Sequence, residues 1–323
     1  MSYFHLNLIL KGKLTVCCLL MLSVIPLNAQ REAKQIGDFK ESISLNEHLR
    51  GTKRTLQYCP DGDEFVCVNG KNRYTRALYG SHSPFRVETS DRPVFAFYNN
   101  GRGGNISFKV ILRDGTELAL DRTGYCESRY SAGKRTYYLT DPSWGKGELR
   151  ISVLALADMD GAIWRFSPSN MPKGAILRWQ HGGATGKRLS RNGDMGVDPA
   201  DCFELPAEAT DLVTGELPLQ KEVYLVRGEV PEGYNVRKLY QQAEAASLAL
   251  ASHLKIETPD PYLNTLGGAL VAAADGIWDG QVWLHGAIGW RMPLSGWRAG
   301  YTGDALGWHD RARTHFDAYA ASQ

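Results

Sequence analysis

Several patterns that reveal an enzyme class are missing from this chain of 323 residues. No expected strand leads into a GxGxxG or P-loop motif, and the glycine-rich segment Gly101–Asn105 lies between two expected strands, where a turn is the simpler interpretation. GxSxG and HExxH are absent, and no Cys/His spacing indicates zinc. A nucleotide enzyme is therefore not indicated, and we expect neither a cofactor nor a metal.

Cysteine is scarce, with six in the whole chain. Two of them precede residue 30, and those that remain are Cys59, Cys67, Cys126 and Cys202. A hairpin turning at Asp61-Gly62 would place Cys59 and Cys67 on opposite faces, which argues against a bridge between them. So few cysteines do not make a disulfide scaffold, and buried thiols are the simplest interpretation; whether any of the four is oxidised stays open.

Apolar runs are short throughout the chain, and the longest of them lies near the start. Lys11 and Lys13 precede the apolar stretch Leu14–Leu27, and Asn28-Ala29 supplies small residues after it. This order predicts a secretory signal peptide over residues 1–29, because the run is too short for a stable transmembrane helix. We therefore expect a secreted, periplasmic protein with no membrane association after cleavage.

No excess of charge of one sign remains once the signal is removed. Loss of Lys11 and Lys13 would leave 35 basic and 35 acidic residues. A neutral protein lacks the electrostatic footprint that nucleic acid or anionic lipid requires. Neither is expected as a partner.

What the chain does contain is β-strand pattern over most of its length. A polar arm, Gln30–Glu47, precedes Thr55–Gly228, where about ten or eleven short runs rich in Val, Ile, Tyr and Phe alternate with turn residues. Asp61-Gly62 and Asn69-Gly70 are hairpin signals and predict a meander at the start. We expect an antiparallel, super-sandwich-like β-sandwich domain over residues 30–230.

The hydrophobic period changes to that of helices near the C-terminal end. A linker helix is predicted within residues 231–258, with Asn235 as its N-cap. Residues 259–323 form a further, helical part, in which the pattern predicts helices from Tyr262 to about Trp278 and from about Asp304 to Ala321. The glycine-rich segment between them is expected to be a loop.

That loop carries the candidate site. Tryptophan stands beside arginine or histidine in it, and a sugar can stack on an indole while the charged neighbour bonds its hydroxyls. The predicted substrate-binding residues are Trp290, Arg291, Trp297, Arg298, Asp304, Trp308 and His309. The alternative is that the tryptophans pack between helix ends and that the charges pair locally, Asp310 with Arg313 for example, with Asp304 as an N-cap.

A catalytic set cannot be assembled from these residues. Glycoside hydrolysis needs two carboxyl groups on either side of the bond. Asp275 and Asp279 lie at the end of the apolar helix and could face a cavity, but no sequence feature marks either as an acid. The catalytic residues stay unknown.

The C-terminal motifs resemble those of a known family. TPDPYLN, ALVAAADGIWDG, WLHGAIGWRMPLSGWR and GDALGWHDRARTHFDAYAASQ are similar to the start of the toroid in large periplasmic polysaccharide-degrading proteins of the six-hairpin glycosidase type. The resemblance implies an N-terminal fragment of a glycoside hydrolase, with inversion favoured, that holds only the first helices of an (α/α)6 toroid. The acid and base would lie on later loops, so that the fragment would be inactive alone.

Two other functions stay open. The chain could be a non-catalytic carbohydrate-binding or structural module, or a fragment of a polysaccharide lyase, for which Tyr301 and His309 are the one weak indication. In each case the expected partner is a poly- or oligosaccharide. In a short helical part, the apolar helix Leu266–Ile277 would leave a surface patch unless it packs on the sandwich.

Overall fold

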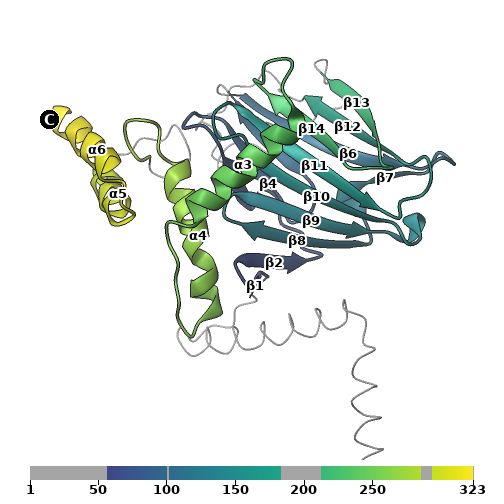
Figure 1. Ribbon diagram of the computed structural model, residues 1–323, viewed down its shortest axis with the longest axis horizontal. Coiled ribbons are helices and arrows are strands. Elements are labelled where there is room, and N and C mark those ends of the chain that lie inside the picture. Colours follow the sequence, from purple (N-terminus) through teal and green to yellow (C-terminus); the bar gives the residue numbers. More distant parts are fainter. Residues whose placement is uncertain (1–56, 100–101, 183–211, 285–292, 323) are drawn as a thin grey trace, which may run out of the picture. The chain divides into compact units, whose positions relative to one another are not determined.

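The computed structural model describes residues 57–99, 102–182, 212–284 and 293–322 (Figure 1). The chain divides into two compact units, residues 1–59 and 60–323, and nearly all of the described structure belongs to the second. The predicted signal peptide and polar arm lie outside the described residues, as do Cys202, Trp290 and Arg291.

Two antiparallel sheets of seven strands each form the larger part of the second unit. Sheet A has the order β1-β2-β8-β9-β10-β11-β14, with strands Cys59–Asp61, Glu64–Val68, Tyr125–Ser131, Lys134–Thr140, Glu148–Ala155, Gly161–Ser169 and Val223–Gly228. Sheet B has the order β13-β12-β6-β5-β4-β3, with strands Val213–Pro218, Ile176–Gly182, Arg102–Ile111, Phe95–Asn99, Arg86–Thr89 and Arg76–Tyr79, and β7 (Glu117–Ala119) also pairs with β6. The predicted antiparallel, sandwich-like fold is confirmed.

The core forms where the inward faces of the two sheets meet. Trp164 of β11 is fully buried, and its ring lies 5.6 Å from the rings of both Phe95 and Phe97, in edge-on contacts. Phe95 also contacts Phe108 at 5.8 Å and Tyr137 at 5.7 Å. Aromatic residues from both sheets thus interlock around one tryptophan, as the period-two pattern of their strands requires.

The first predicted hairpin is present, but the second is not. Gly62 has a φ of +63° in the turn between β1 and β2, as a tight hairpin turn needs. After Asn69-Gly70, however, the chain leaves sheet A, because β2 pairs with β8 whereas β3 pairs with β4 of sheet B. Asn69 is held on β8 by its own hydrogen bonds, with its N–H donating to the carbonyl of Cys126 and its Oδ1 accepting the N–H of Cys126.

The cysteines that the structure describes behave as the simplest interpretation expected. Cys59, Cys67 and Cys126 are buried thiols. Burial raises the pKa of the Cys126 thiol to about 12, which keeps it protonated and unreactive at neutral pH. These three side chains therefore serve as small core residues.

Four α-helices occur in the described part of the chain, and none of these is long and apolar enough to cross a membrane. They are α3 (Val236–Ala251), α4 (Pro261–Gly276), α5 (Pro293–Ala305) and α6 (His309–Ala321); two single 3-10 turns lie at Leu120–Arg122 and Pro142–Trp144. Asn235 caps α3 as predicted, accepting the N–H of Lys238 at 3.0 Å. The helices pack in sequential pairs, α3 with α4 and α5 with α6.

Helix α3 lies across the outer face of sheet A (Figure 1). Its buried residues Leu239, Tyr240 and Ala243 pack on Leu154 of β10 and Ile163 of β11. On β10 and β11, every second side chain points away from the sandwich core, and these outward side chains pack on α3. This apolar contact fixes the helix on the sheet.

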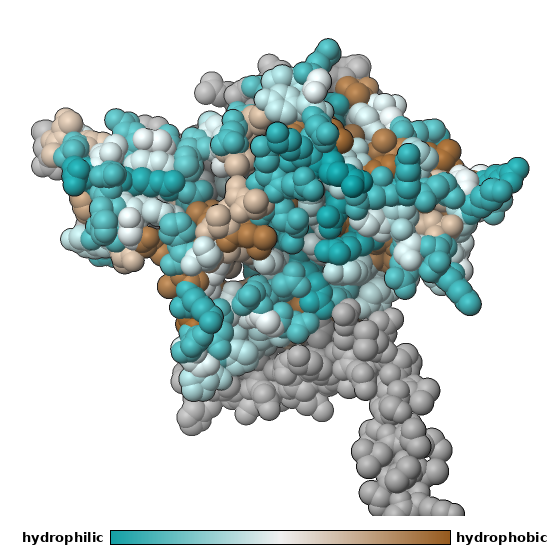
Figure 2. Space-filling view, in the orientation of Figure 1, coloured by the Kyte–Doolittle hydropathy of each residue, from teal (hydrophilic) through white to brown (hydrophobic). Residues whose placement is uncertain are grey.

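Helix α4 packs against β3 with one face and exposes the other. Val271 is fully buried, and a Cβ on Gly276 would come within 2.2 Å of the Tyr79 ring, so only glycine allows this approach. On the opposite face Leu263 and Leu270 are about half exposed, at 47% and 51%. Hydrophobic side chains gather along α4 in the space-filling view (Figure 2). The helix therefore packs on the sandwich, which is the case in which no patch was predicted, while these two leucines stay half exposed.

The glycine-rich stretch before Asp304 is in part helical, contrary to the expectation of a loop. Helix α5 covers Pro293–Ala305, and the chain then turns at Gly307, whose φ is +80°, before α6 begins at His309. The expected helix from Asp304 to Ala321 is therefore two elements. Asp304 lies inside α5 and does not cap α6, whose N-cap residue is Trp308.

The aromatic core generates a stability prediction. We expect Trp164→Ala to lower the free energy of unfolding by about 3–5 kcal/mol, because it removes the ring around which both sheets pack. Leu248→Ala is the matched control, since Leu248 is 59% exposed, and it should change stability by no more than about 0.5 kcal/mol. Urea unfolding followed by circular dichroism measures both. A loss below about 1 kcal/mol for Trp164→Ala would contradict this account of the core.

Candidate functional site

The structure describes part of the predicted substrate-binding set. Trp290 and Arg291 lie outside the described residues, and Trp297 lies in α5 with its side chain outside them as well. Arg298 is exposed on the same helix. The remaining members, Asp304, Trp308 and His309, lie around the turn between α5 and α6.

Asp304 and His309 pair with each other across that turn. His309 Nδ1 lies 2.5 Å from Asp304 Oδ1, and both side chains are largely exposed, at 69% and 59%. Asp310 and Arg313 also form the local helical pair that the alternative interpretation expected, at 3.4 Å. Exposed pairs of this kind contribute little to stability, and they do not by themselves make a site.

Trp308 packs between the helices. Its ring is nearly parallel to that of Trp283 at 6.4 Å, and the guanidinium of Arg311 lies 4.7 Å from its centre. Trp283 is buried, donates its indole N–H to the carbonyl of Ala274 at 2.9 Å and its backbone N–H to His315 Nδ1 at 3.1 Å. With both neighbours close to its ring, Trp308 fits the packing alternative better than a sugar-stacking role.

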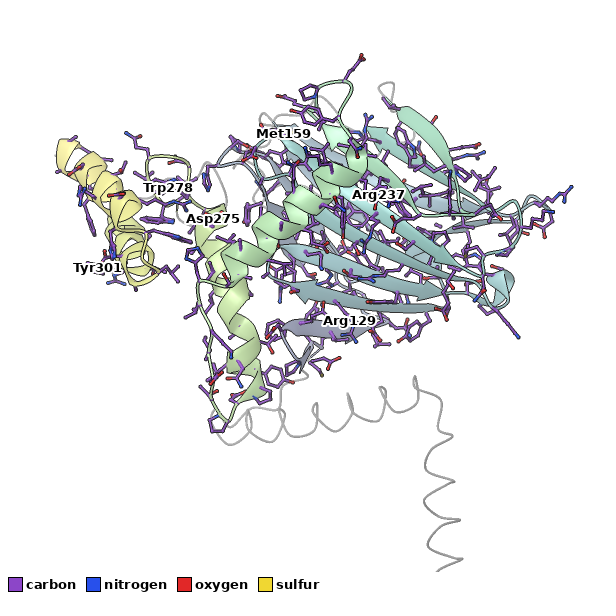
Figure 3. The ribbon with its side chains drawn as sticks, viewed as in Figure 1. Arg129, Met159, Arg237, Asp275, Trp278 and Tyr301 are labelled. Carbon is purple, nitrogen blue, oxygen red and sulfur yellow. The ribbon has the colours of Figure 1, made fainter. Side chains whose placement is uncertain are left out.

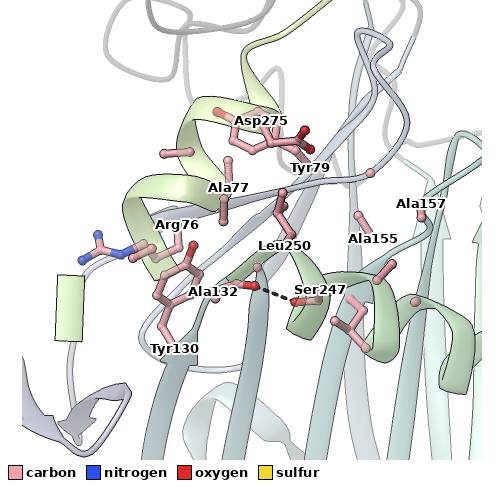
Figure 4. Close-up of a pocket in the computed structure, with 18 of the residues that line it drawn as sticks. Arg76, Ala77, Tyr79, Tyr130, Ala132, Ala155, Ala157, Ser247, Leu250 and Asp275 are labelled. Carbon is pink, nitrogen blue, oxygen red and sulfur yellow. Dashed lines mark hydrogen bonds between the residues drawn. The ribbon is translucent and has the colours of Figure 1, made fainter. Parts of the chain in front are cut away.

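A cavity lies where the sandwich meets the helices. This junction pocket has a volume of about 550 Å³ and is lined by β3, the turn between β8 and β9, the end of β10, α3, α4 and one residue of α6 (Figure 4). Across it, Ser247 of α3 donates a hydrogen bond of 2.5 Å to the carbonyl of Ala132 in the β8–β9 turn. The pocket is therefore walled by elements from both halves of the described chain.

One end of the junction pocket carries a cluster of charges. Asp275, at the end of α4, receives a hydrogen bond of 2.6 Å from Arg311 of α6, and His82 Nε2 lies 3.2 Å from the same oxygen. Only 16% of the Asp275 side chain is exposed. Figure 3 places Asp275 at the end of α4 that leads to Trp278. Arg311 also lies 5.8 Å from the centre of the Trp278 ring, so one guanidinium joins the charge cluster to the tryptophans.

The charge cluster keeps Asp275 ionised. Burial by itself would raise the pKa of this carboxyl, but the hydrogen bonds from His82 and Arg311 and their charges outweigh it, so that the pKa lies below its ordinary value. Asp279, the other carboxylate that the sequence suggested, has a different role, because its Oδ1 accepts the backbone N–H groups of Gln281 and Val282 within a turn.

Two tyrosines also line the junction pocket. Tyr79 is at the end of β3, and Tyr130 is at the end of β8 with the Arg76 guanidinium 5.6 Å from its ring. Burial, and secondarily the nearby charge of Glu88, raises the pKa of Tyr79 to about 12. Its hydroxyl is therefore neutral at physiological pH and can both donate and accept a hydrogen bond.

The sequence analysis did not single out the two tyrosines of the junction pocket, Tyr79 and Tyr130. The signal was present, since Tyr79, Gly80 and His82 repeat, at a strand end, the combination of aromatic, glycine and hydrogen-bonding residues that marked the predicted loop. What the sequence could not show is that β3 comes to lie beside α4, which follows almost two hundred residues later. Asp275, by contrast, was expected to face a cavity, and it does.

The chemistry available in the junction pocket favours binding. Its two lining carboxylates are Asp158 and Asp275, and Asp275 is held in the ionised form, which cannot act as a general acid. In the described part of the chain no group of three or more His, Cys, Asp or Glu could hold a metal ion. Neutral tyrosine hydroxyls, fixed charges and apolar walls are instead the groups that bind a polar ligand with an apolar face.

Comparison with known proteins identifies one family and no function. Residues 100–228 match a family described as "Domain of unknown function (DUF4450)". The matched segment begins just before β6 and runs to the end of β14, so it contains the β8–β9 turn of the junction pocket but neither β3 nor the helices. No curated protein matches the chain.

The Asp275 cluster generates a pH prediction. Because folding lowers the pKa of Asp275, its ionised form stabilises the protein above the unfolded pKa of about 3.9, and this contribution is lost as the pH falls through the folded pKa. We expect Asp275→Asn to lower the free energy of unfolding at pH 7 by about 1.5–3 kcal/mol. The difference in the free energy of unfolding between Asp275→Asn and the parent protein should become smaller below about pH 4.

Asp310→Asn is the matched control for this experiment, since the Asp310 side chain is 96% exposed beside its arginine. Its effect at pH 7 should be close to zero. Unfolding by urea between pH 3 and pH 7 gives both comparisons. An Asp275→Asn effect that stays constant over this range would show that the carboxylate is not held by its charged partners.

Proposed function

We propose that the junction pocket binds carbohydrate and that this chain contributes recognition to a glycan-degrading protein. The observation that carries the proposal is the composition of the pocket wall. Tyr79 and Tyr130 line it, and Tyr79 lies beside the end of α4 that carries the Asp275 carboxylate with its partners Arg311 and His82 (Figure 4). A sugar ring presents an apolar face and a rim of hydroxyl groups, and this wall offers a surface for each.

Size and charge agree with such a ligand. A volume of about 550 Å³ falls within the range of about 300–1,000 Å³ that small-molecule sites occupy. With histidine counted as neutral, the formal charges that line the pocket balance, because the two arginines Arg76 and Arg311 match the two carboxylates Asp158 and Asp275. A neutral or weakly charged oligosaccharide therefore suits the site better than a strongly ionic ligand.

Recognition is the better proposal for this pocket than cleavage. Inverting hydrolysis needs one protonated and one ionised carboxyl about 6.5–9.5 Å apart. The low pKa of Asp275 supplies the ionised form only. If the whole protein is a glycoside hydrolase, as the resemblance of its C-terminal motifs implies, Asp275 would not be its acid.

The helices support a wider assignment. They follow the sandwich in sequential packed pairs, α3 with α4 and α5 with α6, and such helical hairpins are the repeating unit of an (α/α)6 toroid. We propose that these pairs open a toroid of the six-hairpin type, that the protein is secreted to the periplasm, and that its ligand is a polysaccharide or an oligosaccharide. Trp290, Arg291, Trp297 and Arg298 remain proposed substrate contacts in that setting.

A single hydroxyl tests the junction pocket. We expect Tyr79→Phe to weaken binding of a neutral oligosaccharide, first selected on a glycan array, by about 0.5–1.5 kcal/mol in calorimetry, because one hydrogen bond is lost while the ring remains. Tyr301→Phe removes the same group from an exposed tyrosine of α5 and should leave affinity unchanged. Equal losses in both variants, or no binding to any glycan, would refute the proposal.

The α5 residues are tested separately. Trp297→Ala and Arg298→Ala should each weaken oligosaccharide binding by over about 1 kcal/mol if they stack on the sugar and bond its hydroxyls. The same calorimetric titration measures this effect, with thermal unfolding as the second measurement. Unchanged affinity with a lower melting temperature would return both residues to a packing role.

A further inference from the structure

A second, strongly polar pocket lies on the sandwich itself, apart from the helices. Its volume is about 460 Å³. It is formed by the loop after β2, the connection between β4 and β5, the outer side of β6 and the 3-10 turn after β7, and the lining residues that matter here are Lys71, Arg73, Arg92, Val94, Asn105 and Ser107. We call this the β6 pocket.

Asn105 is the first indication that the β6 pocket binds a ligand. The residue is only 8% exposed, yet its side-chain oxygen has no hydrogen-bond partner among the residues described. A buried acceptor left unsatisfied destabilises a fold, so that such groups are rare and need an explanation. Ser107, two residues further along the same strand and on the same face, places a hydroxyl beside it. A ligand that donates a hydrogen bond would satisfy Asn105.

Arg92 is the second indication, because it supplies a fixed positive charge. Its nitrogens donate to three neutral acceptors, which are the backbone oxygens of Asp121 and Thr123 at 3.2 and 2.8 Å and the Asn69 side-chain oxygen at 3.2 Å. These bonds hold the guanidinium in place without neutralising it. The charge thus remains available to a ligand.

Other cations add to this charge. Lys71 and Arg73 also line the β6 pocket, whereas Asp121 is its one lining carboxylate. Lys71 is exposed and can move toward a ligand. Three cations around one carboxylate give a local excess of positive charge on a wall of hydroxyl and amide groups, and such a wall attracts an anion.

We propose that the β6 pocket binds an acidic sugar. The carboxylate of a uronate would lie among Lys71, Arg73 and Arg92, one of its hydroxyls would donate to Asn105 Oδ1, and Val94 would contact its ring. A hydroxyl-free anion such as sulfate would leave Asn105 unsatisfied, and a neutral sugar would leave the cations uncompensated. The β6 pocket and the junction pocket share no residue, so this proposal does not depend on the first.

The test compares two ligands with the same sugar backbone, one with ionised carboxylates and one with these groups neutralised as methyl esters. Tetragalacturonate and its methyl ester are titrated into the protein by calorimetry, and we expect the acid to bind at least about tenfold more tightly. Lys71→Gln combined with Arg73→Gln should remove most of that preference. Lys109→Gln is the matched control. Lys109 lies on β6, as Asn105 does, but outside the pocket, where it is 49% exposed and paired with Glu117. This variant should bind the acid as tightly as the parent protein does.

A second variant separates binding from folding. Asn105→Ala should weaken binding of the acid and raise the melting temperature, because it removes the unsatisfied oxygen; a structural role predicts a lower melting temperature instead. Equal binding of acid and ester, unchanged binding in the double variant or in Asn105→Ala, or displacement by sulfate at the same affinity would overturn the proposal. The two pockets share no lining residue, so loss of the preference for the acid while a neutral oligosaccharide still binds would overturn this proposal and leave the junction pocket untouched.

Discussion

The ionised carboxylate of Asp275 is the contact on which the junction between sandwich and helices depends. It is the common partner of His82, from the loop after β3, and of Arg311, from α6. A largely buried carboxylate is tolerated because its hydrogen bonds with Arg311 and His82 offset the cost of removing it from water. The same contact closes one end of the junction pocket, so the interaction that joins α4 to α6 and to the loop after β3 also shapes the proposed binding site.

Alternation along the strands explains how one sandwich can carry two separate pockets. On β6, Ile106 and Phe108 are buried in the core, whereas Asn105 and Ser107, which alternate with them, line the β6 pocket. On β10, Ile151 and Val153 enter the core while Leu154 packs beneath α3. Each sheet therefore uses one face for the shared core and leaves the other for helices or ligands.

The period-two pattern was enough to predict two antiparallel sheets, because burial on one face dictates it locally. Connections were harder. Asn69-Gly70 has the sequence of a hairpin turn, but its hydrogen bonds to Cys126 hold it on β8 and send the chain to the other sheet. The break at Gly307 was likewise hidden in a helical pattern. The junction pocket depends on the packing of β3 against α4, and no local sequence pattern contains this contact. Of the residues at the charged end of the pocket, the sequence analysis anticipated Asp275 alone.

The central claim is that carbohydrate binds where the sandwich meets the helices. Backbone amide shifts in a ¹H–¹⁵N spectrum, recorded while a neutral oligosaccharide is titrated into the protein, test it most directly. We predict saturable shifts at Tyr79, Tyr130 and Asp275, with none at the exposed Lys109 of β6. Shifts confined to α5 and α6, or no saturable shift with any oligosaccharide, would contradict the account.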